Sequence, residues 1–407
     1  MLKWEKRAKG GGGLIKRILI LLAAAFMALS AGCGVVPGRE RSLSDPVSFE
    51  GEAHSVKVMF VNVGKADAAI VSVDGGVWLI DTGTEESFPN LFAALKLIGA
   101  DSIDGVILTH GHSDHTGGLK PISEVFAVKR VLFPSLLNDR VKVENLVLSL
   151  NLAGEYLRAG DSVEIAGGVY FDVIGPTEQD ADDDNDNSLV VKLTVNGRSF
   201  LFTGDMQFNE DGRILASGAD VSCDVLKVPN HGNPDALSEA FAKAAKPLAA
   251  VISTDTSVDR DSANELVLRK LATAEKYLTQ EHPLGILMTV EENGAVSVSF
   301  PTLPEAASGA ELAEVSIKGQ YFVVRNTSAG DIDLSGWAVY STRGFEVFAF
   351  PDGAALRAGE TFTVACRKSS VNADYIWNVK KAWAENKADY AVLLDKNGCE
   401  VSRRISE

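Results

Sequence analysis

Short apolar runs alternate with amphipathic segments along residues 55–300. Runs such as Val56–Val63 and Ala249–Ser253 are rich in β-branched residues, which favours strands. Apolar residues recur at helical spacing over 141–157, which predicts a helix there. We also expect strands at 68–73, 77–80, 106–109, 169–174, 188–194, 199–203, 224–228, 285–290 and 295–300, and helices at 91–98, 236–245 and 263–272. Two batches of strands interleaved with helices predict an α/β domain of two packed sheets with outer helices.

A seam rich in helix and strand breakers follows at residues 301–309, which hold Pro301, Pro304 and Gly309. In residues 310–407 turn residues separate short strand-like runs, and helical spacing is rare. The clearest runs are 321–325, 337–341, 361–365 and 390–394. We therefore predict a small all-β sandwich over 310–407, joined to the first domain by the linker 301–309.

The first 32 residues are typical of an export signal. Six Lys and Arg accompany an apolar run, Ile18–Gly32, that is shorter than the roughly 20 residues of a bilayer-spanning helix. Small residues directly before Cys33 resemble a bacterial lipobox, whose cysteine is lipidated. We expect a signal peptide over 1–32, lipidation at Cys33 and a tether over 33–54, with an uncleaved N-terminal anchor as the alternative. The protein would then be extracytoplasmic, held by lipid to the bacterial cell membrane.

The chain is acidic, with 39 Lys and Arg against 55 Asp and Glu and a net charge of −16. Such a surface repels polyanions at long range, which disfavours tight, metal-free binding of duplex nucleic acid. It still permits weak nucleic-acid contact and chemistry on phosphates at a local cationic site. Cys366 and Cys399 could form a disulfide if the tail brings them together.

The densest chemical signal is His110-Gly111-His112-Ser113-Asp114-His115, directly after an expected strand. Half of the six histidines of the chain lie in this hexapeptide. Imidazole and carboxylate are ligands of first-row metals, and alternate positions at a strand end can direct two side chains to one ion. Asp114 and His115 then reach a neighbouring position, so the spacing allows two metal ions.

The hexapeptide resembles the signature of the metallo-β-lactamase fold hydrolases, whose fold is an αββα sandwich. Five more motifs of that family occur in this chain in the family's order, before and after the hexapeptide. The first of them along the chain resembles the subgroup found in the competence DNA-uptake channel ComEC. The matching segments are Phe60–Ala68, Ile80–Gly83, Asn187–Val191, Leu201–Asp205 and Leu226–Gly232.

The resemblance implies two divalent ions, Zn²⁺ or alternatively Mn²⁺. It assigns His110 and His112 to a first ion, metal 1. It assigns Asp114, His115 and His231 to a second ion, metal 2.

Three further roles follow from the resemblance. Asp205 would bridge the two ions, and Asp81 would orient a ligand histidine. Many family members supply a third histidine to metal 1, whereas this chain has Asn187 at that place. An amide is a weaker ligand than imidazole, so we expect metal 1 to be weakly occupied.

The implied chemistry is hydrolysis by a metal-bound hydroxide, with Asp114 and Asp205 as catalytic carboxylates. The ComEC-like resemblance favours phosphodiesters, small or polymeric, and Lys65 would either hold a phosphate or be an ordinary surface residue. The alternatives are a hydrolase of lactones or choline-phosphate esters, and a non-catalytic scaffold that binds the cell envelope.

Residues 310–407 resemble the lamin tail domain, an immunoglobulin-like sandwich. The resemblance rests on Tyr321–Thr327, Ile332–Trp337, Phe350–Gly353, Leu356–Glu360 and Ala391–Gly398. It implies binding or positioning of a partner that the sequence does not identify, with a structural role as the alternative.

Overall fold

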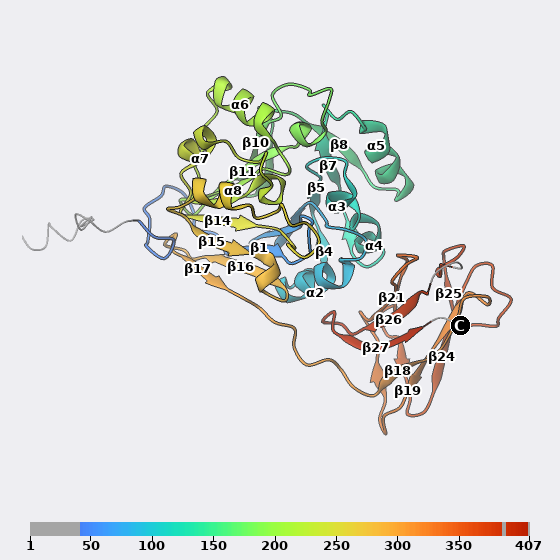
Figure 1. Ribbon diagram of the computed structural model, residues 1–407. Coiled ribbons are helices and arrows are strands. Elements are labelled where there is room, and N and C mark those ends of the chain that lie inside the picture. The colour runs from blue at the N-terminus through green and yellow to red at the C-terminus, as the bar shows by residue number, and fades with distance from the viewer. Residues whose placement is uncertain (1–40, 385–387, 406–407) are drawn as a thin grey trace, which may run out of the picture. The chain divides into compact units, whose positions relative to one another are not determined.

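A computed structural model describes residues 41–384 and 388–405 (Figure 1). The expected signal peptide and Cys33 lie outside these residues. Residues 43–407 make up one compact unit, which holds the domain of the metal motifs and the tail. The boundaries that we expect at 301–309 remain a prediction.

Within the described residues the first sheet has eight strands, in the order β17-β16-β1-β2-β3-β5-β7-β8. Their bounds are Val56–Val61 (β1), Ala69–Val73 (β2), Gly76–Ile80 (β3), Gly105–Ile107 (β5), Val131–Pro134 (β7), Gly154–Leu157 (β8), Gly285–Val290 (β16) and Val296–Ser299 (β17). The strands from β17 to β3 are antiparallel to their neighbours, and β3, β5, β7 and β8 are parallel. Parallel strands end at a common edge, and the metal motifs follow β3 and β5 there.

A second sheet of seven strands, counted over the same residues, has the order β15-β14-β13-β12-β11-β10-β9. Its strands are Ser162–Ala166 (β9), Val169–Gly175 (β10), Val190–Val195 (β11), Arg198–Phe202 (β12), Val225–Lys227 (β13), Ala249–Ile252 (β14) and Glu275–Leu278 (β15). Strands β12 to β15 are parallel, so the segments that follow β12 and β13 leave the sheet at the same edge.

The two sheets pack face to face over a core of buried aromatic and aliphatic side chains. Phe60 of β1 stacks on Phe202 of β12 at 5.8 Å between ring centroids, and Trp78 of β3 meets Phe171 of β10 edge-on, also at 5.8 Å. Since both faces of β1 are covered, its sequence lacks the polar–apolar alternation of a half-exposed strand.

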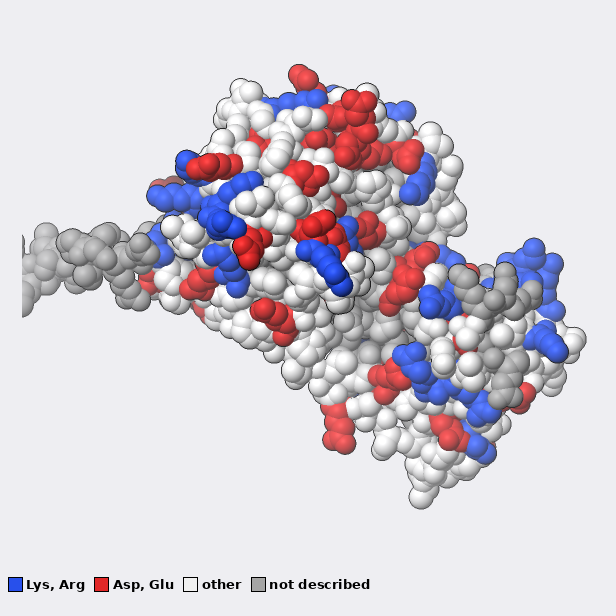
Figure 2. All heavy atoms as spheres, viewed as in Figure 1, with Lys and Arg blue, Asp and Glu red and all other residues white. Residues whose placement is uncertain are grey.

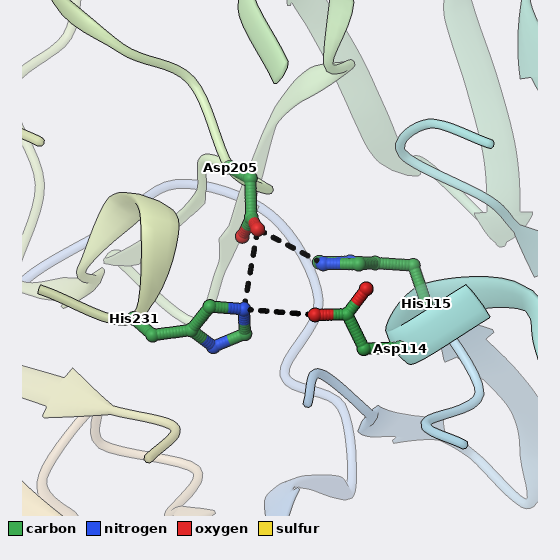
Figure 3. Close-up of side chains that lie close together, drawn as sticks. All are labelled: Asp114, His115, Asp205 and His231. Carbon is green, nitrogen blue, oxygen red and sulfur yellow. Dashed lines mark ion pairs between the residues drawn. The ribbon is translucent and has the colours of Figure 1, made fainter. Parts of the chain in front are cut away.

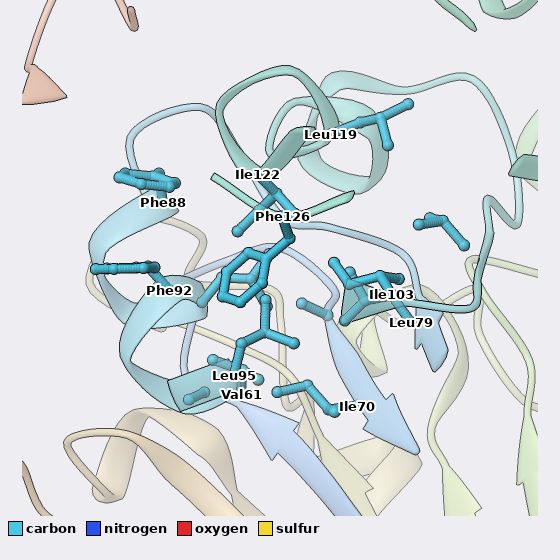
Figure 4. Packing of buried hydrophobic residues seen from close by; sticks show 14 of the residues in the cluster. Val61, Ile70, Leu79, Phe88, Phe92, Leu95, Ile103, Leu119, Ile122 and Phe126 are labelled. Carbon is cyan, nitrogen blue, oxygen red and sulfur yellow. The ribbon is translucent and has the colours of Figure 1, made fainter. Parts of the chain in front are cut away.

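Helices cover the outer faces of both sheets (Figure 1). Helix α2 (Phe88–Ile98) and α4 (Leu119–Ser123) bury their apolar sides on the first sheet. Phe92 lies between Phe88 and Phe126, at 5.6 and 6.0 Å between ring centroids, in the same core cluster as Val61, Ile70 and Leu79 (Figure 4). The other helices of the described residues are α3 (Ser113–Thr116), α5 (Arg140–Ser149), α6 (Phe208–Ser217), α7 (Glu239–Ala245) and α8 (Glu265–Lys270). The predicted αββα sandwich is confirmed.

Some elements differ from the sequence prediction. The expected helix 141–157 is helix α5 followed by strand β8, which pairs in parallel with β7. Leu157 fits the helical spacing of apolar residues, but it lies in strand β8 and is buried there. Helix α6 was not expected, and its N-terminus is capped from another segment, as described below. The minor elements are β4 (Ser102–Ile103), β6 (Ala127–Val128) and 3₁₀ turns at Asn185–Asn187, Pro229–Gly232 and Thr279–Glu281.

The expected tether 33–54 is in part packed on the domain. Leu43 is buried, and the fully buried Arg198 donates through Nη2 to Leu43 O at 2.9 Å. Val47 N–H donates to Asn293 O at 3.0 Å. A cation without exposure needs acceptors, and backbone carbonyls of this segment supply them. Residues 43–47 are therefore part of the folded domain.

The tail is an all-β sandwich, as predicted. One four-stranded sheet, of the residues described, comprises β18 (Ala310–Ser316), β19 (Tyr321–Asn326), β24 (Thr361–Cys366) and β25 (Tyr375–Trp377). The other comprises β22 (Val347–Ala349), β21 (Ala338–Ser341), β26 (Tyr390–Leu394) and β27 (Glu400–Ile405), and a short pair joins β20 (Ile332–Asp333) to β23 (Ala355–Leu356). Phe322, Trp337, Phe348 and Trp377 lie in its core.

The tail contacts the larger domain through specific side chains. The Tyr340 hydroxyl donates to Glu85 O at 2.9 Å, and Lys120 pairs with Glu346 at 2.6 Å. Cys366 and Cys399 are both buried and free, so the disulfide considered between them is absent from the described residues. No helix in residues 41–384 or 388–405 combines the length and the apolar character that crossing a bilayer requires.

Candidate metal centre

The hexapeptide lies at the carboxyl edge of the first sheet, where β5 passes into α3. Thr82 N–H donates to His115 O at 2.7 Å, and Asp67 N–H donates to Asp114 O at 3.1 Å. The loops that follow β1 and β3 therefore hold the backbone of α3. Gly118 approaches Thr82 so closely that a Cβ would lie 2.0 Å from Thr82 O, which explains a glycine there.

Four predicted ligands converge at this edge: Asp114, His115, Asp205 and His231 (Figure 3). One ligand atom from each lies within 4.8 Å of all the others. Asp205 Oδ2 is 3.2 Å from His115 Nε2 and 3.1 Å from His231 Nε2. His231 Nε2 is 3.5 Å from Asp114 Oδ2. Two imidazole nitrogens and two carboxylates surrounding one point form the donor set of a first-row divalent ion.

Three polar atoms of this cluster are buried without hydrogen-bond partners. These atoms are His115 Nε2, His231 Nε2 and Asp205 Oδ1. An unsatisfied buried polar atom costs free energy, and here the nitrogens face carboxylates without hydrogen-bond geometry. The residues therefore fit a divalent ion that would accept these lone pairs.

Asp81 sets the orientation of His115. Asp81 Oδ2 lies 2.7 Å from His115 Nδ1, while its Oδ1 accepts the Thr109 N–H at 2.7 Å. With Nδ1–H donating to the carboxylate, Nε2 is directed at Asp205. Asp81 has φ 59°, an uncommon value for a residue with a side chain. This contact with His115 agrees with the role that we predict for Asp81, which stays a prediction.

His231 is held by a backbone carbonyl. Its Nδ1 lies 2.9 Å from Ser253 O, which leaves Nε2 facing Asp205 and Asp114. Asn230 and His231 both have positive φ, 42° and 52°, in the turn that follows β13. Asn230 instead donates through Nδ2 to Asp235 Oδ1 at 3.1 Å, so His231 is the residue of this motif that reaches the cluster.

His110 and His112 lie beside the cluster as a pair. His110 Nε2 is 2.9 Å from His112 Nδ1, and the His110 ring lies 4.1 Å from that of His115 between centroids. His110 is buried and His112 is exposed. Ser188 Oγ lies 3.3 Å from His110 Nδ1. Among the described residues, no cluster of possible metal ligands includes His110 or His112, so their assignment to metal 1 stays a prediction.

Asn187 lies elsewhere than the expected ligand position. Its Oδ1 accepts the Asp180 N–H at 2.7 Å, and its Nδ2 donates to Asp180 O at 2.8 Å and to Asp184 Oδ1 at 2.9 Å. The amide is thus engaged with the acidic loop 180–186. The geometry gives no support to the ligand role, because the ligating oxygen already has a partner.

The acidic loop has a structural role of its own. Asp186 Oδ1 accepts the N–H groups of Gln207 (2.8 Å) and Glu210 (3.1 Å) and so caps α6. Asp180 pairs with Arg213 of that helix at 3.2 Å. No cluster of metal-ligand type includes this loop among the residues described.

Two functional candidates went unnoticed in the sequence: Asp67 and Lys227. The Lys227 ammonium forms an ion pair with Asp67, lies 3.7 Å from Asp205 Oδ1 and donates to Gly204 O at 2.9 Å. Asp67, Lys227 and Asp81 line a cavity of about 10 Å³ behind the cluster, room for about one water. Both residues lie inside segments that resemble family motifs, and a buried lysine among carboxylates is the signal that was missed.

The charges of the cluster shift its protonation equilibria. Burial acts to lower the pKa of His115, but the charges of Asp205 and Asp81 raise it well above its usual value. Burial also acts to lower the pKa of His231, but the charges of Asp205 and Asp67 raise it to about 9. Burial lowers the pKa of His110 well below the ordinary value, with the charge of His115 adding to the effect. The metal 2 histidines therefore hold protons that an ion must displace, and buried His110 is neutral, as a ligand has to be.

A lysine marks the solvent side of the cluster. Lys65 Nζ lies 3.2 Å from Asp114 Oδ2, and their side chains are 25% and 21% exposed, whereas those of His115 and His231 are fully buried. Burial acts to raise the pKa of Asp114, but the neighbouring His231 and the charges of His115 and Lys65 hold it below the usual value. The cluster thus opens to solvent beside a cation.

His54 and His282, the two histidines outside the metal motifs, have local partners. His54 Nδ1 is 2.6 Å from Asp74 Oδ2. The His282 ring stacks on Phe300 at 3.7 Å.

Comparison with known families identifies both parts. Residues 61–256 match the metallo-beta-lactamase superfamily, and residues 304–406 match the Lamin Tail Domain. The chain is 26% identical over 275 residues to ComE operon protein 3 of Bacillus subtilis, an alignment that covers 62% of this chain and 34% of the relative. It is 26% identical over 245 residues to Competence protein ComA of Neisseria gonorrhoeae, covering 58% and 33%. The chain thus spans about a third of the length of these relatives.

Two solved structures resemble this chain with low sequence identity and a low TM-score. One is the metallo-beta-lactamase fold protein YhfI from Bacillus subtilis, with a TM-score of 0.40, 16% identity, and coverage of 58% of this chain and 99% of that one. The other is a diphosphatase from the PhnP family, with a TM-score of 0.38, 15% identity, and coverage of 59% and 98%.

The family matches and the αββα fold agree with the convergent ligand set. The predicted resemblance to ComEC-like competence proteins is confirmed by the two curated relatives. Residues 61–256 thus form a domain that matches the metallo-beta-lactamase superfamily, and residues 304–406 form one that matches the Lamin Tail Domain.

Proposed function

We propose that the chain hydrolyses phosphodiesters at the site formed by Asp114, His115, Asp205 and His231. The convergence of these four side chains, with unsatisfied buried atoms, is the observation that carries the proposal. The similarity to competence proteins supports the class of enzyme.

The protein's own residues prepare the site for this chemistry. Asp81 and the Ser253 carbonyl fix the rings of His115 and His231, so both ligand nitrogens are aimed before an ion arrives. When bound, divalent ions of this class supply an activated water and polarise the scissile group. Zn²⁺ suits the mixed nitrogen and oxygen donors, with Mn²⁺ as the alternative.

The choice of a phosphodiester rests on charge at the mouth of the site. Lys65 lies next to the exposed side of Asp114, where it can accompany a non-bridging phosphate oxygen. A lactone or a β-lactam presents no phosphate for this cation to hold. The acidic remainder of the domain makes a local cation more significant for an anionic substrate.

The decisive experiment compares substrate classes at one site. The purified full-length chain, supplied with Zn²⁺ or Mn²⁺, is assayed with bis(p-nitrophenyl) phosphate, p-nitrophenylphosphorylcholine, a chromogenic lactone and a chromogenic β-lactam. We expect turnover of the phosphodiester, abolished in Asp205→Asn and His231→Gln. The variant Lys65→Gln should raise KM for the phosphodiester with little change in the metal content. Preference for the lactone would transfer the proposal to that substrate class, whereas preference for p-nitrophenylphosphorylcholine, itself a phosphodiester, would narrow the proposal to choline-phosphate esters. No turnover of any substrate would favour the envelope-binding scaffold.

We also propose that the protein is extracytoplasmic and lipid-anchored at Cys33. The motif before Cys33 supports this, and the similarity to competence proteins agrees with a role at the cell envelope. Cells that express wild type or Cys33→Ser are labelled with a clickable fatty acid. Label on the wild type alone is expected, and equal label on both proteins would contradict the anchor.

A further inference from the structure

One end of the tail carries six exposed basic side chains, which we call the basic end. They are Lys318, Arg343, Arg367, Lys368, Lys380 and Lys381. Each lies in a turn or a strand exit: the β18–β19 turn, the β21–β22 turn, and the segments that follow β24 and β25. Figure 2 shows lysine and arginine atoms gathered on this part of the tail.

Backbone hydrogen bonds bring the segments that follow β24 and β25 together. Arg367 N–H donates to Val379 O at 3.1 Å, next to Lys380. Ser369 Oγ donates to Gly319 O at 2.6 Å, next to Lys318. Three segments are therefore joined at one end of one sheet.

The buried Asp389 connects the fourth segment to the same end. Its Oδ1 accepts the Arg343 N–H at 2.9 Å, and its Oδ2 accepts the Ala384 N–H at 2.9 Å. The 382–384 stretch also reaches the β18–β19 turn, since Ala382 N–H donates to Gln320 Oε1 at 2.8 Å. The basic side chains thus project from a hydrogen-bonded framework.

Five of the six basic side chains at the basic end lack the acidic partners that arginines have elsewhere on the tail. The stretches 317–320, 342–345, 367–373 and 378–384 contain no Asp or Glu. Within the part of the chain that the structure describes, Lys318, Arg343, Arg367, Lys368 and Lys380 form no salt bridge. At the other end of the same sheet, Arg325 pairs with Glu311 at 2.5 Å and Arg357 with Glu360 at 4.0 Å.

Charge is distributed unequally between the two domains. Residues 43–309 hold 19 Lys and Arg against 40 Asp and Glu, whereas residues 310–407 hold 12 against 13. The excess of carboxylates in residues 43–309 repels a polyanion. At the basic end several exposed cations form no salt bridge, and the Asp389 carboxylate beside them is buried and accepts backbone N–H groups. A polyanion would therefore gain most there.

We propose that the basic end binds the phosphate backbone of a polynucleotide without reading its sequence. Lysine and arginine neutralise phosphates, and such contacts position a strand but carry no base information. Membrane contact generally adds exposed apolar side chains to the basic ones. The large apolar residues exposed on the described tail, Ile376, Tyr390 and Ile405, all lie outside the four stretches, which favours a polynucleotide over a membrane.

The proposal deepens the proposed function, because a strand held by the tail would be a polymeric phosphodiester carried by the chain that contains the hydrolytic site. Binding itself needs no hydrolysis. It is therefore measured with the metal-loaded full-length chain and a fluorescein-labelled, hydrolysis-resistant phosphorothioate oligonucleotide of about 30 nucleotides, by fluorescence anisotropy across a salt series.

Two matched double variants separate the basic end from net charge. Arg343→Gln/Arg367→Gln removes two arginines of the basic end, and Arg325→Gln/Arg357→Gln removes two from the other end of the tail. We expect the first to weaken binding roughly tenfold and to reduce the salt slope by about 1.4, since each phosphate contact on a single strand contributes about 0.7. The second should bind as the wild type does. Lys318→Gln/Lys368→Gln replaces the first variant if that one misfolds by circular dichroism.

Each other outcome overturns the proposal. Equal loss in both double variants would mean that net charge alone governs binding, and unchanged binding in both would remove the basic end from consideration. If Arg343→Gln/Arg367→Gln lost binding to phosphatidylglycerol vesicles but still bound the oligonucleotide as the wild type does, the basic end would be reassigned to a membrane. Failure of the proposed function is seen separately, as absent hydrolysis of bis(p-nitrophenyl) phosphate by the wild type.

Discussion

Lys227 and Asp67 form a buried ion pair directly behind the ligand cluster. Burial acts to lower the pKa of Lys227, but the charges of Asp67 and Asp205 raise it, so the ammonium stays charged. The site has four carboxylates, Asp67, Asp81, Asp114 and Asp205, within two overlapping clusters. The Lys227 ammonium is a fixed cation that offsets part of this negative charge behind the cluster, at a place that a metal ion held by the cluster does not reach.

Replacing Lys227 tests this role. Lys227→Met should destabilise the protein by about 3–5 kcal/mol, because it leaves a buried carboxylate uncompensated. Lys227→Met/Asp67→Leu should recover much of the loss, since neither charge remains. Urea denaturation of the metal-free proteins measures both. Equal stability of the single and double variants would show that the pair is not coupled.

Asp81 is expected to govern the affinity for metal 2 through His115. Asp81→Asn removes the charge that fixes the ring, and we expect Zn²⁺ affinity to fall roughly 10- to 100-fold. Competition with a chromophoric chelator measures this. Asp74→Asn is the matched control, because Asp74 holds His54 at a similar distance outside the site. A similar loss in both variants would point to a general effect on folding.

The sequence was sufficient for the fold and for most of the centre. The hexapeptide and His231 lie in short motifs, and the β-sheet edge that unites them follows from parallel strands. Asp67 and Lys227 are far apart in the chain and join only through packing, so local patterns could not pair them. The prediction of one helix over 141–157 was wrong because Leu157 belongs to strand β8 and is buried there. The spacing of apolar residues does not distinguish burial in a helix from burial in a strand that follows it.

Asn187 shows the limit of carrying a role over by position. The place in the motif order was sound, but side-chain direction depends on loop 180–186, whose polar groups engage the amide. Asn187→His should therefore lose these hydrogen bonds and cost about 1–3 kcal/mol, without tightening metal 1. Calorimetric titration with Zn²⁺ and thermal melting check the two parts. A tighter second ion in Asn187→His would restore Asn187 to the ligand set.

Metal binding should release protons, because the histidines of metal 2 are protonated when no ion is present. The pKa of His231 is raised to about 9 and that of His115 well above its usual value, mainly by Asp205. A ligand nitrogen must lose its proton, so affinity for Zn²⁺ should rise with pH until about pH 9 and then level off. Calorimetry at pH 7.5 in buffers of different ionisation enthalpy should give about two protons released per tight ion.

The metal-free protein should show the opposite dependence. A folded-state pKa above the unfolded value of about 6.5 contributes stability that is complete below pH 6.5. That stability is lost as pH rises through about 9, the folded-state pKa of His231. The Tm of the metal-free protein should thus fall over this range, while the Zn²⁺-loaded protein, whose nitrogens are already deprotonated, should not follow it. His231→Gln should flatten the metal-free profile, whereas His54→Gln, outside the site, should leave it unchanged. A profile that keeps its slope in His231→Gln would place the titrating group elsewhere.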